Sequence, residues 1–108
     1  MGMAISKQFQ SNENVWVIRP SGYLDLFNLP EVREALCGTE GRDILFCCEE
    51  LRYLDSAVIK LLAEVAAARR AEGHVFQMRG LKPYIYKIIE MVGLQQMFVF
   101  ENGEEGQA

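Results

Sequence analysis

The sequence predicts an α/β fold: a mixed β-sheet of four to five strands with helices packed mainly on one face. Strand and helix patterns follow one another in the order β-β-α-β-α-β-α-β, which is typical of a largely parallel sheet with right-handed crossovers. Residues 43–48 form a continuous apolar run bounded by charges, as expected of a buried central strand. Gly38, Gly73 and Gly93 follow the three helical patterns, where glycine commonly ends a helix.

The first two strands are predicted to form a hairpin. Residues 4–10 read as a strand, the polar segment 12–14 reads as a turn, and the apolar residues 15–18 read as the second strand. Pro20-Ser21-Gly22 is expected to end that second strand, because proline and glycine interrupt regular structure. The hairpin adds an antiparallel edge to the sheet.

A short helix is predicted from about Leu29 to Cys37. Asn28 and Glu31 have the spacing of a capping box, in which each side chain satisfies a backbone N–H of the first turn. Pro30 fits the same first turn, where its missing N–H costs little.

Two further helices follow from helical periodicity. In the first, the apolar residues form one face: Val58, Leu61, Leu62, Val65 and Ala66. The second begins at Pro83 and carries a stripe made of Ile85, Ile88, Ile89 and Val92. Residues 75–79 and 97–101 are predicted as the last two strands.

Composition restricts the classes of function. A chain of 108 residues, half of them apolar, predicts one domain over 1–108, with a core of about 4–101 and a frayed tail at 102–108. The net charge of −4 disfavours nucleic-acid binding, which needs clustered basic residues. No apolar run approaches the roughly 20 residues of a membrane span, and no signal peptide is recognisable, so we expect a cytoplasmic protein without membrane insertion.

Catalytic and metal sites are not predicted. The single histidine, His74, is separated from Ser56 by a helix about 24 Å long, too far for a dyad. Motifs that bind nucleotides or build a nucleophile elbow are absent from the sequence. Cys37, Cys47 and Cys48 lack zinc spacing and are interpreted as small buried hydrophobic residues. We therefore expect no enzyme activity, no cofactor and no metal.

The Asp55-Ser56 pair marks the start of the second helix. Either side chain can accept a hydrogen bond from a free N–H of the first turn, which stabilises a helix by about 1 kcal/mol. From the residues alone, a helix cap is therefore the simplest interpretation of Ser56.

Three short motifs and their order resemble a known family. GYLD at 22–25, LDSA at 54–57 and MVGL at 91–94, with Gly73 before a strand, resemble motifs of the STAS domain, whose best-known members are bacterial anti-sigma factor antagonists. The similarity extends from about Ile5 to Phe100. It implies the STAS fold for nearly the whole chain.

The resemblance also implies a switch. Ser56 stands where the family has its phosphorylated serine, Asp55 where it has the preceding aspartate, and Asp25 where it has a loop aspartate near the phosphorylation site. By this resemblance, the unphosphorylated protein binds an anti-sigma factor that is also a serine kinase, and phosphorylation breaks the complex. The implied partner-binding residues are Asp25, Leu26, Phe27, Asp55, Ser56, Ala57 and Val58.

Two departures from the family pattern leave alternatives open. Ala57-Val58 replaces the usual Ser-Gly, which puts a branched side chain where a kinase or partner would approach. Leu26-Phe27 replaces polar residues common in the family, so Phe27 either alters the docking surface or packs as a hydrophobic staple on Val32. The alternative functions are a STAS interaction module in a signalling or transport assembly that is not switched by phosphate, and a small-ligand-binding or enzymatic domain. The sequence does not predict the oligomeric state.

Overall fold

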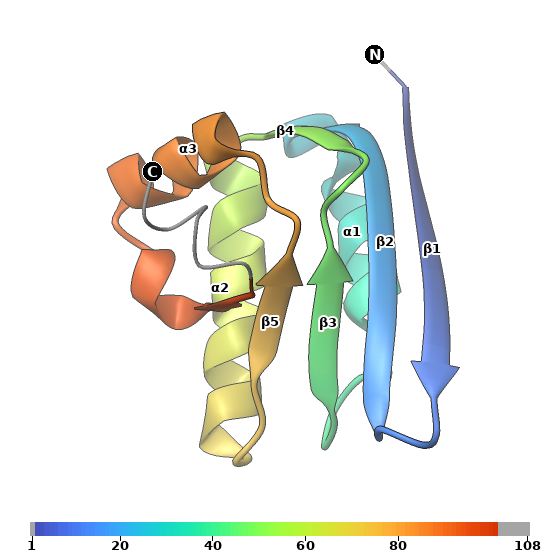
Figure 1. The fold of residues 1–108 in the computed structure, drawn as a ribbon. Coiled ribbons are helices and arrows are strands. Elements are labelled where there is room, and N and C mark those ends of the chain that lie inside the picture. The colour runs from blue at the N-terminus through green and yellow to red at the C-terminus, as the bar shows by residue number, and fades with distance from the viewer. Residues whose placement is uncertain (1, 102–108) are drawn as a thin grey trace.

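The computed structural model describes residues 2–101, so the tail predicted at 102–108 lies outside the described residues. Strands and helices alternate much as the sequence predicts (Figure 1). In chain order the elements are β1 (Met3–Gln10), β2 (Val15–Leu24), the 3-10 turn η1 (Leu26–Asn28), α1 (Leu29–Leu36), β3 (Asp43–Cys47), β4 (Leu51–Leu54), α2 (Ser56–Ala71), β5 (Phe76–Arg79), α3 (Pro83–Val92), the 3-10 turn η2 (Gln95–Met97) and β6 (Val99–Phe100).

The strands form one mixed, six-stranded sheet. Its order is β1-β2-β3-β5-β6, and β4 also pairs with β2. β1 is antiparallel to β2, and every other pair is parallel. The predicted mixed α/β fold is confirmed. The prediction of four to five strands omits β4.

β2 extends beyond the end that the sequence predicts, because it changes partner at Pro20. Its ladder with β3 ends at the Ile18–Phe46 pair, and its ladder with β4 begins at the Gly22–Leu51 pair. Pro20 stands between the two ladders, where a residue without an N–H is tolerated. Gly22 follows with φ of 82°, and a Cβ atom there would lie 2.2 Å from the Gly2 carbonyl oxygen. Only glycine fits this position without distortion.

The main core lies between the sheet and the helices, on one face of the sheet (Figure 1). The opposite face carries a second, smaller buried cluster, made of Val15, Val17, Leu45 and Cys47. The predicted stripes of α2 and α3 point into the main core: Val58, Leu61, Leu62, Ala66, Ile85 and Ile89 are buried. The prediction of helices mainly on one face is therefore confirmed.

The predicted capping box of α1 is wrong, because Asn28 belongs to the preceding turn. The Asn28 Oδ1 atom accepts a hydrogen bond from the Asp25 N–H at 3.0 Å, and the Asp25 Oδ1 atom accepts one from the Phe27 N–H at 3.0 Å. The box thus closes η1, and Asn28 makes no side-chain cap on α1. Of the two alternatives left open for Phe27, the staple on Val32 is absent, since Phe27 is 85% exposed while Val32 is buried.

The cysteines are buried at two of their three positions. Cys47 and Cys48 are buried as predicted, and burial raises the pKa of the Cys47 thiol. Cys37 is exposed, contrary to the prediction, because it follows the last turn of α1 rather than lying on its buried face.

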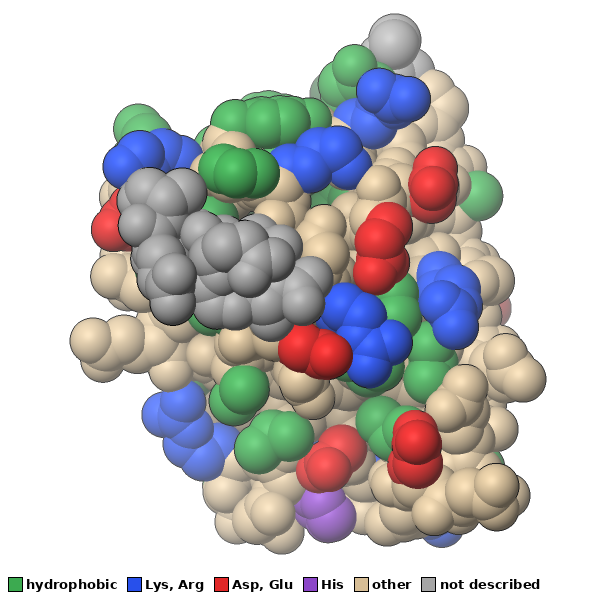
Figure 2. Space-filling model, in the orientation of Figure 1, with side chains coloured by type: hydrophobic (Ala, Val, Ile, Leu, Met, Phe, Trp, Pro, Cys, Tyr) green, Lys and Arg blue, Asp and Glu red, His purple; other side chains and the backbone are tan. Residues whose placement is uncertain are grey.

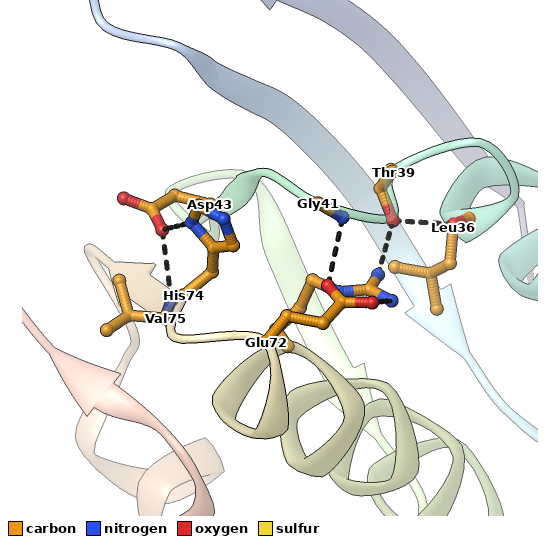
Figure 3. Close-up of polar contacts among 8 residues, drawn as sticks. Leu36, Thr39, Gly41, Asp43, Glu72, His74 and Val75 are labelled. Atoms are coloured by element: carbon orange, nitrogen blue, oxygen red, sulfur yellow. Dashed lines mark hydrogen bonds and ion pairs between the residues drawn. The ribbon is translucent and has the colours of Figure 1, made fainter.

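A polar network fixes the C-terminal end of α2 (Figure 3). The Arg69 side chain is buried; its Nη1 donates to the Thr39 hydroxyl at 3.0 Å, and its Nε donates to the Glu72 carboxylate at 2.8 Å. The Gly41 N–H donates to the same carboxylate at 2.9 Å. These two hydrogen bonds lower the pKa of Glu72, the Gly41 N–H contributing most. The loop between α1 and β3 is thereby tied to α2.

His74 continues this network and lies at the end of α2 that is remote from Ser56. Its Nδ1 atom is 3.0 Å from the Asp43 Oδ1 atom, which also accepts a hydrogen bond from the Val75 N–H at 3.0 Å (Figure 3). The histidine therefore holds the start of β3 to the start of β5. This arrangement explains His74 structurally.

Replacing Arg69 should destabilise the fold. We expect Arg69→Ala to lower the free energy of unfolding by about 2–4 kcal/mol, because it removes a buried, fully bonded side chain and leaves Thr39 with one partner fewer. The neighbouring exposed Arg70 is the matched control, and Arg70→Ala should cost less than about 1 kcal/mol. Urea denaturation followed by circular dichroism measures both. Equal losses for the two variants would contradict the structural role of Arg69.

Candidate functional site

Ser56 is the first residue of α2, and Asp55 caps the helix. The Asp55 Oδ1 atom accepts a hydrogen bond from the Val58 N–H at 3.0 Å. Ser56 is exposed, and within residues 2–101 its hydroxyl makes no hydrogen bond. The sequence allowed either Asp55 or Ser56 to cap α2, and in the structure the cap is Asp55. Ser56 is left with a solvent-facing hydroxyl at a helix N-terminus.

The Asp55 carboxylate also binds the turn that follows β2. Its Oδ2 atom accepts a hydrogen bond from the Leu26 N–H at 2.8 Å, and the Asp55 N–H donates to the Leu24 carbonyl oxygen at 3.2 Å. One carboxylate thus joins the start of α2 to the start of η1. The two segments are 29 residues apart in the chain.

Asp25 shapes the same turn from its other side. Its carboxylate accepts from the Phe27 N–H, so the side chain is turned toward its own backbone and is half-buried. The turn leaves two large apolar side chains in solvent, Leu26 at 56% and Phe27 at 85% exposure. The Asp25 and Asp55 loops that the resemblance singled out are therefore brought together around η1.

Val58 does not belong to this surface. Its side chain is fully buried in the main core, because it lies on the face of α2 that packs against the sheet. The expectation that Val58 contacts a partner is corrected accordingly. Ala57 is half-buried and contributes a single methyl group beside Ser56. We call the remaining residues the α2 N-terminal surface: Asp25, Leu26, Phe27, Asp55, Ser56 and Ala57.

Three tyrosines beside β4, of which Tyr53 and Tyr84 are exposed and Tyr23 is half-buried, are not predicted from the sequence as part of a surface. The rings of Tyr23 and Tyr53 pack with centroids 6.3 Å apart. Tyr84 is 52% exposed, and its hydroxyl donates to the Arg52 carbonyl oxygen at 2.6 Å. Figure 2 views the face of the sheet away from the helices, and hydrophobic side chains gather beside Lys and Arg side chains at the end where β4 lies. For these tyrosines the sequence offers one signal: Tyr84 lies outside the isoleucine stripe of α3.

The chemical group that this surface offers is the Ser56 hydroxyl, which could accept a transferred group. A hydroxyl at a helix N-terminus is accessible to a modifying enzyme, and the helix dipole favours negative charge there. Carboxylates stand beside it, whereas His74 lies at the far end of α2 and cannot serve as its base. Among residues 2–101, no three His, Cys, Asp or Glu side chains are grouped to hold a metal ion. In the same range, no helix is long and apolar enough to span a membrane.

Comparisons with known proteins agree with this geometry. The model of the STAS domain family matches residues 6–106. The anti-sigma-B factor antagonist of Bacillus subtilis strain 168 is 22% identical over 106 residues, covering 96% of this chain and 97% of its own. The anti-sigma factor antagonist SpoIIAA in its unphosphorylated form superposes with a TM-score of 0.71 at 18% identity, covering 96% of this chain and 93% of its own.

The structure of the Bacillus cell fate determinant SpoIIAA in its phosphorylated form also superposes on the chain. The TM-score is 0.64 at 20% identity, and the match covers 96% of each chain. At these identities the solved structures show the fold alone. The predicted fold class is therefore confirmed by both the family match and the structural neighbours.

Asp55 should stabilise the protein through its two hydrogen bonds. We expect Asp55→Ala to lower the free energy of unfolding by about 1–2 kcal/mol, because the first turn of α2 loses its cap and the Leu26 N–H loses its acceptor. Asp55→Asn is the matched control: it keeps one capping oxygen and should lose less than Asp55→Ala. Thermal and urea unfolding measure the difference. An alanine variant as stable as the parent would show that Asp55 does not hold the two segments.

Proposed function

The chain belongs to the STAS domain family, and we propose that it acts as an anti-sigma factor antagonist that is switched by phosphorylation of Ser56. In this proposal it binds an anti-sigma factor that is also a serine kinase, frees a sigma factor and so regulates transcription. The relatives named above as antagonists support a binding function rather than catalysis. The carrying observation is the exposed Ser56 hydroxyl at the first residue of α2, beside an aspartate that already supplies the cap.

The burial of Val58 supports access of a kinase to Ser56 despite the departure at Ala57-Val58. The Val58 side chain is buried in the core, so of the two replaced residues only Ala57 adds a side chain near the surface, and that side chain is a single methyl group. Because Asp55 caps α2, the Ser56 hydroxyl can be modified without removing a hydrogen bond that the helix needs. The phosphorylated domain is therefore expected to keep its fold.

A phosphate on Ser56 changes the surface that a partner meets. It carries about −1.5 to −2 charges near neutral pH and would be added next to the Asp55 carboxylate. The helix N-terminus tolerates that charge in the free protein. The six residues of the α2 N-terminal surface include no Lys or Arg, so a docked partner would have to bury this charge incompletely paired, and such desolvation weakens binding by about a thousandfold or more.

The apolar residues beside the serine provide the contact area in this proposal. Leu26 and Phe27 are held in solvent by a turn whose backbone is bonded to both Asp25 and Asp55. A rigid exposed aromatic side chain is a typical anchor for a pocket on another protein. We further propose that the chain binds its anti-sigma factor in the bacterial cytoplasm.

The switch is tested by phosphorylation. Incubated with ATP and the anti-sigma factors with serine kinase activity from the same genome, the protein should gain one phosphate by intact mass, and Ser56→Ala should gain none. Ser11→Ala is the matched control and should gain one. The phosphorylated protein should bind the same partner about a thousandfold more weakly in calorimetry. Absence of phosphate, or phosphate at another residue, would overturn the switch.

A second candidate is an interaction module that is not switched by phosphate, and the 85% exposed Phe27 favours it, because apolar docking needs no modification. Binding without any phosphate transfer would support this candidate.

Under either function we expect Phe27→Ala to weaken binding to the partner by at least about tenfold, because it removes the proposed apolar anchor. The free energy of unfolding should not change, because the Phe27 side chain makes no core contact. Met91, also 82% exposed but on α3, gives the control Met91→Ala, which should bind normally. Equal affinities for the parent and Phe27→Ala would exclude Phe27 as an anchor.

A further inference from the structure

The outer edge of β1 is free to pair with another strand. Among residues 2–101, β1 is the terminal strand of the sheet and pairs with β2 alone (Figure 1). Its eight residues, MAISKQFQ, contain one charged residue and no proline. Long edge strands without proline or several charges are the edges that readily accept a further strand, since their backbone groups lack partners.

The ladder with β2 identifies the backbone groups that face outward. The Gly2 carbonyl oxygen accepts a hydrogen bond from the Tyr23 N–H at 3.2 Å, so this pair is a bonded one. Bonded and non-bonded pairs alternate in an antiparallel ladder, which turns the N–H and C=O groups of every second residue away from β2. By this alternation the outward groups belong to Met3, Ile5, Lys7 and Phe9. Pro20 agrees, because it lies opposite Ile5 in a pair that requires no N–H from β2.

An open hollow lies beside this edge, between β1 and α1. Its volume is about 430 Å³, and it is lined by Met3, Ile5, Lys7, Glu31, Glu34 and Ala35. The remaining charged side chain in the middle of α1, Arg33, lines a different hollow on the side of α2. The flank of α1 that faces β1 is therefore acidic, above a strand whose one charge is positive.

We propose that the edge is completed by β1 of a second copy of this chain, paired antiparallel about a two-fold axis at Ser6. In this register the outward groups of Ile5 meet those of Lys7 of the second copy, and those of Met3 meet those of Phe9 of the second copy. About eight hydrogen bonds join the two strands, two for each bonded pair. The two six-stranded sheets become one continuous sheet.

A second copy fits this edge because the strand complements itself. Lys7 lies opposite an isoleucine, so the two Lys7 side chains are diagonal neighbours rather than a directly opposed pair of like charges. Within each copy, Lys7 already lies beside Glu31 and Glu34, which line the same hollow, and its Nζ atom donates to the Cys37 carbonyl oxygen, so its charge is balanced before the edges meet. Met3 and Phe9 pair an apolar side chain with an aromatic one at both ends of the ladder.

The dimer leaves the α2 N-terminal surfaces free. A two-fold axis through β1 reverses the strand direction, so the ends of the sheet that carry Ser56 point in opposite directions. Neither Ser56 nor Phe27 lies on β1. The proposal therefore does not depend on the proposed function, and each can fail without the other.

Sedimentation equilibrium of the whole chain, from about 5 to about 500 µM, tests the dimer. We expect a monomer–dimer equilibrium for the parent and for Ile5→Val, which keeps the N–H and has nearly the volume of proline. Ile5→Pro removes that outward N–H and should weaken dimerisation at least about tenfold, with an unchanged circular dichroism spectrum. Phe27→Ala should dimerise like the parent, because it lies outside the edge.

Several outcomes would overturn the proposal: a parent chain that stays monomeric over the whole range, equal dimerisation of Ile5→Pro and Ile5→Val, or loss of the dimer in Phe27→Ala. Should Ile5→Pro lose its fold, Lys7→Glu decides instead, since it leaves the backbone donor in place. It should weaken dimerisation, because the two-fold axis would bring the introduced carboxylates of both copies close together, each beside its own Glu31 and Glu34, and added salt should partly restore it. A Lys7→Glu variant that dimerises as well as the parent would then exclude this edge.

Discussion

The candidate site depends on the pairing of two buried leucines. Leu24, the last residue of β2, lies opposite Leu54, the last residue of β4, and both side chains are fully buried in the main core. The residues that follow them, Asp25 and Asp55, are therefore forced to leave the sheet side by side. This pairing exists because β2 exchanges β3 for β4 around Pro20, after which the Gly22 N–H donates to the Glu50 carbonyl oxygen at 3.0 Å. Without that exchange the two aspartates would follow unrelated strands.

The Asp55 carboxylate turns this proximity into a fixed geometry. One oxygen satisfies the first turn of α2 through Val58, and the other satisfies the turn after β2 through Leu26. Both N–H groups would otherwise be left to water, so the aspartate stabilises the helix and the turn together. The exposed Phe27 side chain is then held on a defined backbone, which lowers the entropy that docking has to overcome. The same residue thus builds the fold and presents the surface.

Much of the fold follows from periodic patterns in the sequence, and the parts that do not are those without a period. The apolar spacing of α2 and α3 and the glycines after them predict both helices closely. β4 escapes because its four residues are buried only at the first and last positions, so no alternation is visible. The exposure of Phe27 could not be predicted, because it depends on Asn28. The Asn28 side chain accepts from the Asp25 N–H rather than capping α1. The Asp25 and Ser56 positions came from the family resemblance, since no local pattern distinguishes them.

The two ends of α2 decide how a charge at Ser56 can act. At its start the helix is bonded through Asp55 to the turn after β2, and at its end the buried Arg69 and Glu72 bond it to the loop before β3. Between these ends one face of the helix packs into the main core. A conformational switch requires an element with two alternative conformations. A helix bonded at both ends has one, so a phosphate has no second conformation of α2 to stabilise. The proposed phosphate at Ser56 would therefore act at the surface that a partner touches, where desolvation of the charge costs most.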